Sequence, residues 1–196
     1  ADAGQDITLC EGECTTLNAS GGNTYMWNTQ ETTSSINVCP PTTTAYTVTV
    51  ADVYGCTDSD QVTVYVNPIP TADAGQDTEI CEGQCTDLMA SGGVTYLWSN
   101  NATDATINVC PTITTKYTVT VTDNNGCTDS DDVLITVNPL PQANAGSDVS
   151  ICSGDCTTLV ATGGSQYTWN TGETDASIDV CPASTATYSV TVTDDN

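Results

Sequence analysis

The sequence predicts an all-β protein made of tandem β-sandwich repeats, and three observations carry this prediction. Apolar residues alternate with Thr, Ser and Asn at a period of two, as half-buried strands require. No segment shows helical periodicity. Cysteine and tryptophan positions recur at a spacing of 71 residues, which marks an internal repeat.

The repeat divides the 196 residues into units at 1–71, 72–142 and 143–196, and the third unit stops after 54 residues. The eleven cysteines fall into sets of four, four and three, because Cys56 and Cys127 have no counterpart in the third unit. We therefore expect either that the natural chain continues with further repeats or that a neighbouring subunit supplies the missing last strand.

Six short strands are predicted in the first unit, separated by turn signals such as Gly21-Gly22 and Pro40-Pro41 and followed by a Pro-rich linker at 67–70. We expect these strands at residues 6–10, 14–19, 24–28, 35–39, 45–52 and 58–67. The third of them carries Trp27. Six or seven short strands with a Trp on the third are typical of a small immunoglobulin-like (Ig-like) β-sandwich.

Several motifs return along the chain, among them Ala-Asp-Ala-Gly-x-Asp, Tyr-x-Trp in the third predicted strand, and Gly-Cys-Thr-Asp-Ser-Asp before the last one. With these motifs the chain resembles, in every unit, the PKD-like and Ig-like repeats of large proteins secreted by Bacteroidota. The resemblance implies a non-catalytic extracellular module of the kind that serves as a stalk, spacer, adhesin or binding domain.

Strand order predicts which cysteines meet. The second and fourth strands of such a sandwich are antiparallel neighbours, so a cysteine at the start of one lies beside a cysteine at the end of the other. This predicts the disulfides Cys14–Cys39, Cys85–Cys110 and Cys156–Cys181.

Cys10 and Cys56 are predicted at opposite ends of one unit, about 20 Å apart at 3.3 Å per strand residue, which is beyond the reach of a disulfide. Because the end of one unit faces the start of the next, we expect Cys10 to bond to Cys127 across the repeats. Two alternatives stay open. One is a Cys10–Cys56 pair inside the unit, and the other is a zinc site built from four thiolates.

Charge and cysteine content narrow the function classes. The net charge is -24, with one Lys, no Arg and no His, so nucleic acid and anionic lipid surfaces are excluded as partners. The missing imidazole and the small repeats predict that the chain is not an enzyme. Eleven cysteines indicate an oxidising compartment, and no apolar run approaches transmembrane length. These features predict an extracellular protein, either secreted or on the cell surface.

Aspartates gather at the predicted unit ends, where several carboxylates suit a hard cation such as Ca²⁺. Solvated surface acidity without a bound ion is the alternative reading. Calcium is the one cofactor that the sequence suggests, and its candidate ligands are Asp2, Asp6, Asp52, Asp58, Asp73, Asp77, Asp123 and Asp129.

The aromatic residues are interpreted as structural, and the hydroxyl residues as structural or as sites of glycosylation. Trp27, Trp98 and Trp169 are expected in the core, and Tyr46 is expected to bond back to the backbone at a turn. Dense Thr favours O-linked sugar, with β-propensity as the alternative. The candidate positions for O-linked sugar are Thr42, Thr43 and Thr44. Asn18 and Asn101 begin acceptor patterns for N-linked sugar, with chance matches in a Thr- and Asn-rich chain as the alternative.

Together these features predict a structural function: an extracellular rod or fibre of disulfide-linked Ig-like repeats, as in a surface appendage or adhesin stalk. The expected partners are copies of the chain or further repeats, and glycans. A carbohydrate- or ligand-binding module of a secreted protein is the alternative, and an exposed aromatic row would favour it.

Overall fold

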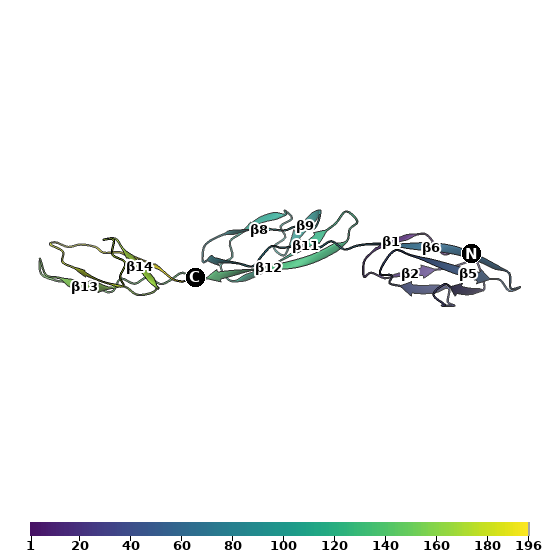
Figure 1. Cartoon of the computed structure of the whole chain (residues 1–196), viewed down its shortest axis with the longest axis horizontal. Helices are drawn as coiled ribbons and strands as arrows, with labels where there is room; N and C mark the ends of the chain where they lie inside the picture. Colours follow the sequence, from purple (N-terminus) through teal and green to yellow (C-terminus); the bar gives the residue numbers. More distant parts are fainter. Residues whose placement is uncertain (196) are drawn as a thin grey trace. The chain divides into compact units, whose positions relative to one another are not determined.

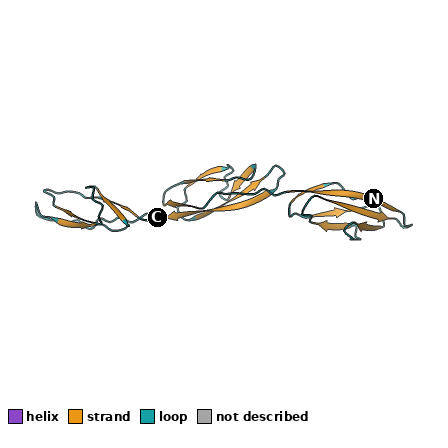
Figure 2. Cartoon of the chain, viewed as in Figure 1, coloured by secondary structure: helices purple, strands orange, loops and turns teal. Residues whose placement is uncertain are grey.

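The computed structural model describes residues 1–195, and within this range the chain forms strands and turns and no helix (Figure 2). The first repeat contains six strands, labelled in part in Figure 1. They are β1 (Ile7–Cys10), β2 (Thr15–Asn18), β3 (Thr24–Trp27), β4 (Ser35–Val38), β5 (Thr44–Ala51) and β6 (Thr57–Asn67). All six lie within one residue of the predicted bounds, so the strand prediction is confirmed.

The six strands form two sheets, in the order β1-β6-β5-β3 and β2-β4. β5 pairs antiparallel with β6 and with β3, and β2 pairs antiparallel with β4. β1 instead runs parallel to β6, with Ile7 opposite Val64 and Cys10 opposite Asn67. An Ig-like sandwich has the same two sheets. One holds the third, fifth and sixth strands, and the other pairs the second strand with the fourth.

The core of the first repeat lies between these two sheets. Trp27 and Leu17 are each 1% exposed, and Val48, Val62 and Val64 are fully buried. The valines of β5 and β6 alternate with half-buried or exposed residues, because successive side chains of a strand point to opposite faces. The predicted all-β Ig-like fold is therefore confirmed.

A close backbone approach explains the Gly-Gly turn before β3. Gly21 has a φ of +94°, a left-handed conformation that favours glycine. At Gly22 an added Cβ would lie 2.6 Å from Cβ of Val50, a core residue of β5. The turn can pass over the core edge only because both positions lack a side chain.

The second repeat has the same strand order, β7-β12-β11-β9 in one sheet and β10-β8 in the other. β12 and β7 are again parallel, with Asn138 opposite Cys81. Trp98, Val119, Val121, Val133 and Ile135 are buried, as are their counterparts in the first repeat. The strands are β7 (Thr78–Cys81), β8 (Thr86–Met89), β9 (Thr95–Trp98), β10 (Thr106–Val109), β11 (Thr115–Thr122) and β12 (Thr128–Asn138).

The third repeat, as described to residue 195, holds four strands in two pairs. β13 (Thr157–Val160) pairs with β15 (Ser177–Val180), and β14 (Gln166–Trp169) pairs with β16 (Val190–Thr193). Residues 149–152, which correspond to β1 and β7, form no strand. Trp169 is still 1% exposed, so these two strand pairs hold a core without the first and last strands.

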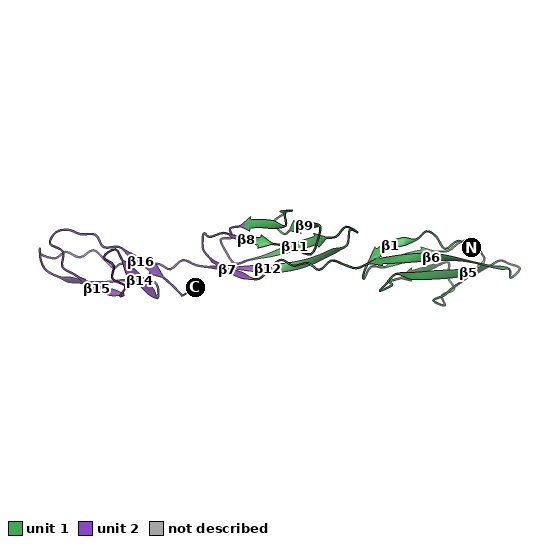
Figure 3. Ribbon diagram, turned by 45° about the horizontal axis from the view of Figure 1, so that its top comes forward, with its two compact units in different colours: residues 1–76, 87–108, 116–133 green, residues 77–86, 109–115, 134–196 purple. Residues whose placement is uncertain are grey.

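The chain divides into two compact units, coloured green and purple in Figure 3. Unit 1 comprises residues 1–76, 87–108 and 116–133, and unit 2 comprises residues 77–86, 109–115 and 134–196. The second repeat thus contributes to both units, and the repeat boundaries at 71 and 142 stay predictions. No described helix is long and apolar enough to cross a membrane.

Candidate functional sites: disulfides, aspartates and an open sheet edge

One disulfide position recurs in every repeat. Antiparallel pairing of β2 with β4 sets Thr15 opposite Val38, so the cysteines just outside the pair meet. The Cα atoms of Cys14 and Cys39 lie 4.2 Å apart, and those of Cys85–Cys110 and Cys156–Cys181 lie 4.1 Å apart. Each bond closes a loop with a separation of 25 residues, for which the chain-entropy model gives about 3 kcal/mol of stabilisation.

A fourth disulfide joins two repeats. Cys10, at the end of β1, bonds to Cys127, just before β12, with the Cα atoms 5.6 Å apart and a sequence separation of 117. The parallel pairing of β1 and β6 explains why Cys10 does not bond to Cys56. Cys10 lies opposite Asn67 at the far end of β6, whereas Cys56 precedes Thr57 at its start.

The structure thus brings together all four cysteine pairs named by the sequence analysis. Among the described residues Cys56, Cys81 and Cys152 carry no disulfide. No group of three or more Cys, Asp or Glu side chains in residues 1–195 could hold a metal ion, so the four-thiolate zinc alternative has no geometric support.

Cys127 follows a turn that the side chain of Asp123 stabilises by hydrogen bonds. The Oδ1 atom of Asp123 accepts the backbone N–H of Asn125 at 2.8 Å and of Cys127 at 2.9 Å. Burial works against the charged form of this carboxyl, but the N–H groups of Cys127 and Asn125 outweigh it and hold the pKa of Asp123 below its ordinary value. Asp52 accepts the N–H of Tyr54 and Cys56 in the same way. These two aspartates fix the turns that carry Cys56 and Cys127.

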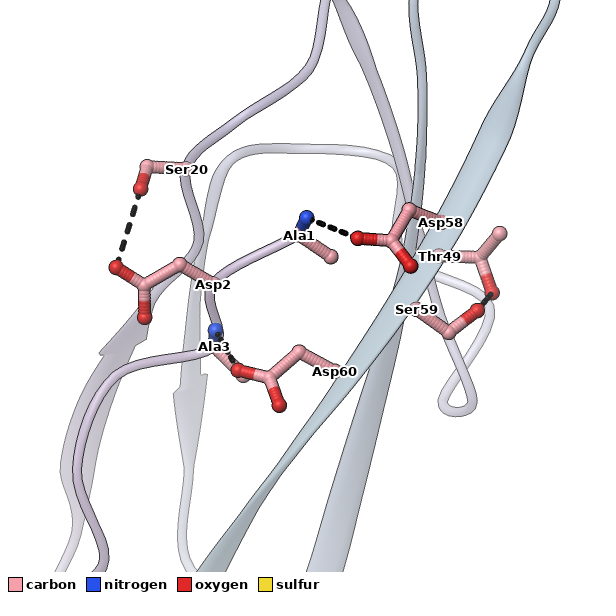
Figure 4. A network of polar contacts seen from close by, with 8 residues as sticks. All are labelled: Ala1, Asp2, Ala3, Ser20, Thr49, Asp58, Ser59 and Asp60. Carbon is pink, nitrogen blue, oxygen red and sulfur yellow. Dashed lines mark hydrogen bonds and ion pairs between the residues drawn. The ribbon is translucent and has the colours of Figure 1, made fainter.

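The candidate calcium ligands do not form a group of three or more that could hold a metal ion among the described residues. Each of these carboxylates instead accepts a hydrogen bond from the chain itself, and the calcium site stays a prediction. Asp58 accepts the Ala1 ammonium at 2.6 Å and Asp60 accepts the N–H of Ala3 at 2.8 Å (Figure 4). In the same view the side chain of Asp2 accepts a hydrogen bond from the Ser20 hydroxyl at 3.4 Å. Asp2 points to one side of the N-terminal segment, and Asp58 and Asp60 lie on the other side.

The remaining calcium candidates also bind backbone N–H groups rather than one another. Asp6 accepts the N–H of Thr63 at 2.8 Å, which ties the segment before β1 to β6. The second repeat uses the same contacts: Asp73 accepts Gly75, Asp77 accepts Leu134, and Asp129 accepts Ala72. The acidic residues at the strand ends therefore order the backbone.

The three tryptophans and one tyrosine of each repeat bind backbone carbonyls. The indole N–H of Trp27 donates to the Thr33 carbonyl at 3.0 Å, and Trp98 and Trp169 make the equivalent bond. Among the described residues the tyrosine hydroxyls that donate to a backbone carbonyl are those of Tyr25, Tyr96 and Tyr167. The corner role expected of Tyr46 is therefore wrong. Tyr46 is buried, and this burial together with Glu31 raises the pKa of its hydroxyl.

The candidate glycosylation positions lie on the surface, but the hydroxyls of Thr43 and Thr44 have partners. Asn18 and Asn101 are exposed. Thr44 donates its hydroxyl to the Thr42 carbonyl at 2.6 Å, and Thr43 Oγ1 accepts the N–H of Val66 at 3.1 Å. Thr43 thereby holds the end of β6 against the turn before β5.

The third repeat contains a groove of about 650 Å³. It lies between the segment at 147–152 and the segment at 182–188, with Leu159, Trp169 and Val180 at its base. Ile151 is 36% exposed there, whereas Ile80 at the same repeat position is 8% exposed. The groove lies on the side of the core that β6 and β12 cover in the first two repeats.

No protein-family model matches the chain, and no curated protein matches it. Three Ig domains of titin, I67–I69 in an E-to-A variant, are similar in structure at a TM-score of 0.42 and 14% identity, over 86% of this chain and 77% of that chain. The insect immune protein hemolin is similar at a TM-score of 0.37 and 14% sequence identity, over 70% of this chain and 46% of that chain.

The three N-terminal domains of the bacteriophage RB49 outer capsid protein Hoc give a TM-score of 0.36 and 19% identity, over 83% of this chain and 71% of that chain. These similarities are too low to support the fold assignment, which depends on the strand order and the core described above. The PKD-like type and the origin in Bacteroidota stay predictions.

Proposed function

We propose that the chain is a structural module of an extracellular rod or fibre, such as a surface appendage or adhesin stalk. The observation that carries the proposal is the Cys10–Cys127 disulfide, which joins the first repeat to the second. A covalent bond between neighbouring repeats restricts bending at the linker that connects them.

The linkers and the cysteine content support the same role. Residues 67–70 and 138–141 read Asn-Pro-Ile-Pro and Asn-Pro-Leu-Pro, and Pro-rich linkers act as semi-rigid spacers. Four disulfides are typical of proteins in oxidising compartments, which favours secretion or display on the cell surface. The partners we propose are further repeats or copies of the same chain.

The buried tryptophans weaken the binding-module alternative. Stacking on a sugar needs an exposed aromatic face, and Trp27, Trp98 and Trp169 are each 1% exposed. Repeats of nearly the same pattern suit a spacer better than a recognition tip, which needs a distinctive unit.

Small-angle scattering and negative-stain microscopy of the double variant Cys10→Ser/Cys127→Ser test the proposal. We expect the wild-type chain to give elongated particles of one shape, and the variant to give a broader range of bends at the first linker. The double variant Cys56→Ser/Cys152→Ser is the matched control and should behave as wild type. Globular wild-type particles, or equal bending in all three proteins, would contradict the rod.

A further inference from the structure

We propose that Asn125 is a site of spontaneous covalent modification, at which the backbone nitrogen of Gly126 attacks the side-chain amide and converts the residue to aspartate or isoaspartate. Asparagine is a thermolabile residue, and Asn125-Gly126 is the one place in the sequence where glycine follows it. Both residues lie in the turn before β12, next to Cys127, which bonds to Cys10. The modification is independent of the structural role proposed above, because it needs only this turn and water.

The reaction balances with water as its co-reactant. In the first step the Gly126 nitrogen bonds to Cγ of Asn125, the Cγ–Nδ2 bond breaks, and Nδ2 leaves as ammonia with the amide proton of Gly126. The product is a succinimide ring. In the second step water adds to one of the two ring carbonyls. Opening at Cγ gives aspartate, whereas opening at the main-chain carbonyl gives isoaspartate, in which the backbone runs through Cγ and is longer by a CH₂ group.

The structure leaves the attacking nitrogen accessible. Asn125 and Gly126 are exposed, and a Cβ added to Gly126 would meet no atom within 4 Å apart from its chain neighbours, so the ring has room to form. The N–H of Gly126 donates to the Asp123 carbonyl at 3.3 Å, which is long for a backbone hydrogen bond and holds the nitrogen weakly. Glycine also lacks the Cβ that hinders the approach of other residues.

Asp123 holds the side chain of Asn125 beside the reacting backbone. Its Oδ1 atom accepts the N–H of Asn125 at 2.8 Å, and its Oδ2 atom accepts the side-chain Nδ2 at 3.2 Å. Nδ2 is the atom that leaves as ammonia. The conversion therefore replaces a hydrogen-bond donor by a second carboxylate beside that of Asp123, and like charges at this distance repel.

The same turn holds Cys127, so the modification acts on the bond between the first two repeats. The Oδ1 atom of Asp123 also accepts the N–H of Cys127 at 2.9 Å, and Cys127 is 1% exposed. An extra CH₂ group in the backbone moves this N–H relative to its acceptor, while the new carboxylate repels Asp123. We expect the loosened turn to open the Cys10–Cys127 disulfide to external thiols.

The first repeat supplies the same turn without the reactive amide. Asp52 Oδ1 accepts the N–H of Tyr54 at 2.8 Å and that of Cys56 at 2.9 Å, so Tyr54 stands at the position of Asn125. The variant Asn125→Tyr therefore keeps a residue that this turn accepts, and it removes the amide that the Gly126 nitrogen attacks.

Ageing of the purified 196-residue chain in mildly alkaline buffer tests the modification. Peptide mass spectrometry should show the exchange of NH₂ for OH at Asn125 on the order of tenfold faster than at Asn124, where the attacking residue carries a Cβ. An isoaspartate-specific methyltransferase should label the aged wild-type chain and leave the aged Asn125→Tyr variant unlabelled.

Reduction by dithiothreitol tests the consequence. In the aged wild-type chain Cys10–Cys127 should be reduced on the order of tenfold faster than in the fresh chain, because the loosened turn opens more often. The Cys85–Cys110 bond of the same repeat should keep its rate. The aged Asn125→Tyr variant should be reduced at the rate of its fresh form.

Three results would overturn the proposal. The first is conversion of Asn125 no faster than that of Asn124, which would show that the turn protects the amide. The second is labelling of the aged Asn125→Tyr variant at the wild-type level, which would place the reactive residue elsewhere. The third is an equal reduction rate of Cys10–Cys127 before and after ageing, which would refute the effect on the disulfide.

Discussion

Residues 1–71 and 143–195 follow the same sequence pattern, yet they differ in their sheets. The first repeat forms β1 at Ile7–Cys10, while the corresponding residues 149–152 form no strand, although Val149 and Ile151 keep the apolar alternation. The difference lies in the neighbour: β6 pairs with β1, and the third repeat as described has no counterpart of β6. In the first two repeats this four-residue segment is a strand, and a parallel partner lies beside it.

The strand pairs common to both regions show which part of the sandwich stands by itself. β2 pairs with β4 and β3 with β5 in the first repeat, and β13–β15 and β14–β16 repeat these registers in the third. Both regions bury their Trp to 1% exposure. The disulfide and the tryptophan hold this inner part, while the last strand completes the core on one side.

The largest effect is expected from a change that makes the first repeat resemble the third. Val64→Asp places a carboxylate without a partner at a fully buried position of β6, at a cost on the order of 4 kcal/mol. Hydrogen exchange should then become fast at β1 and β6 and stay unchanged at β14 and β16. Tyr65→Asp, at the exposed neighbouring residue, is the control. Continued protection of β1 in the Val64→Asp variant would show that β1 forms without β6.

A smaller effect is expected when the same core leucine is truncated in the first and third repeats. Leu17→Ala empties a site that is 1% exposed and should lower the free energy of unfolding of its repeat by about 2–5 kcal/mol. Leu159→Ala at the half-buried counterpart should cost less than half of that, because solvent already reaches the side chain. Denaturant unfolding followed by hydrogen exchange of each region measures both values. Equal losses would mean that the groove does not weaken the third core.

The smallest expected effect is the dependence of folding stability on pH through Asp60. The N–H of Ala3 is the main cause that holds the pKa of Asp60 below its ordinary value of 3.8 in the folded state. A lowered folded pKa stabilises the fold above the unfolded pKa, and this contribution disappears as the pH falls through the folded pKa. Wild type should therefore be more stable than Asp60→Asn at pH 7, and the two should converge as the pH falls through the folded pKa of Asp60. Asp148→Asn is the matched control in the third repeat, which has no counterpart of Asp60 among residues 143–195. A difference between wild type and Asp60→Asn that does not shrink as the pH falls would contradict the role of this charge.

Much of the fold could be predicted because it depends on local patterns. Period-two alternation set the bounds of β1 to β6 within one residue, and the 71-residue spacing identified the tandem array. The positions of Cys14 and Cys39 beside an antiparallel pair follow from strand order alone. The hydrogen bonds of the aspartates could not be predicted, because composition reports how many carboxylates lie near a turn but not which backbone N–H groups face them.

The parallel pairing of β1 with β6 was not predicted, since it joins segments 57 residues apart and leaves no local signal. The same holds for Tyr25, whose hydroxyl reaches the Gly22 carbonyl only because the Gly-Gly turn folds over β5.

The sequence by itself determined the all-β class, the repeat, the strand positions and the cysteine sets, because side-chain period and spacing are properties of the chain. Only the tertiary structure decided which strands pair and which backbone N–H groups the carboxylates bind. These contacts depend on segments distant in sequence, because Ile7 lies opposite Val64 and the carboxylate of Asp6 accepts the N–H of Thr63.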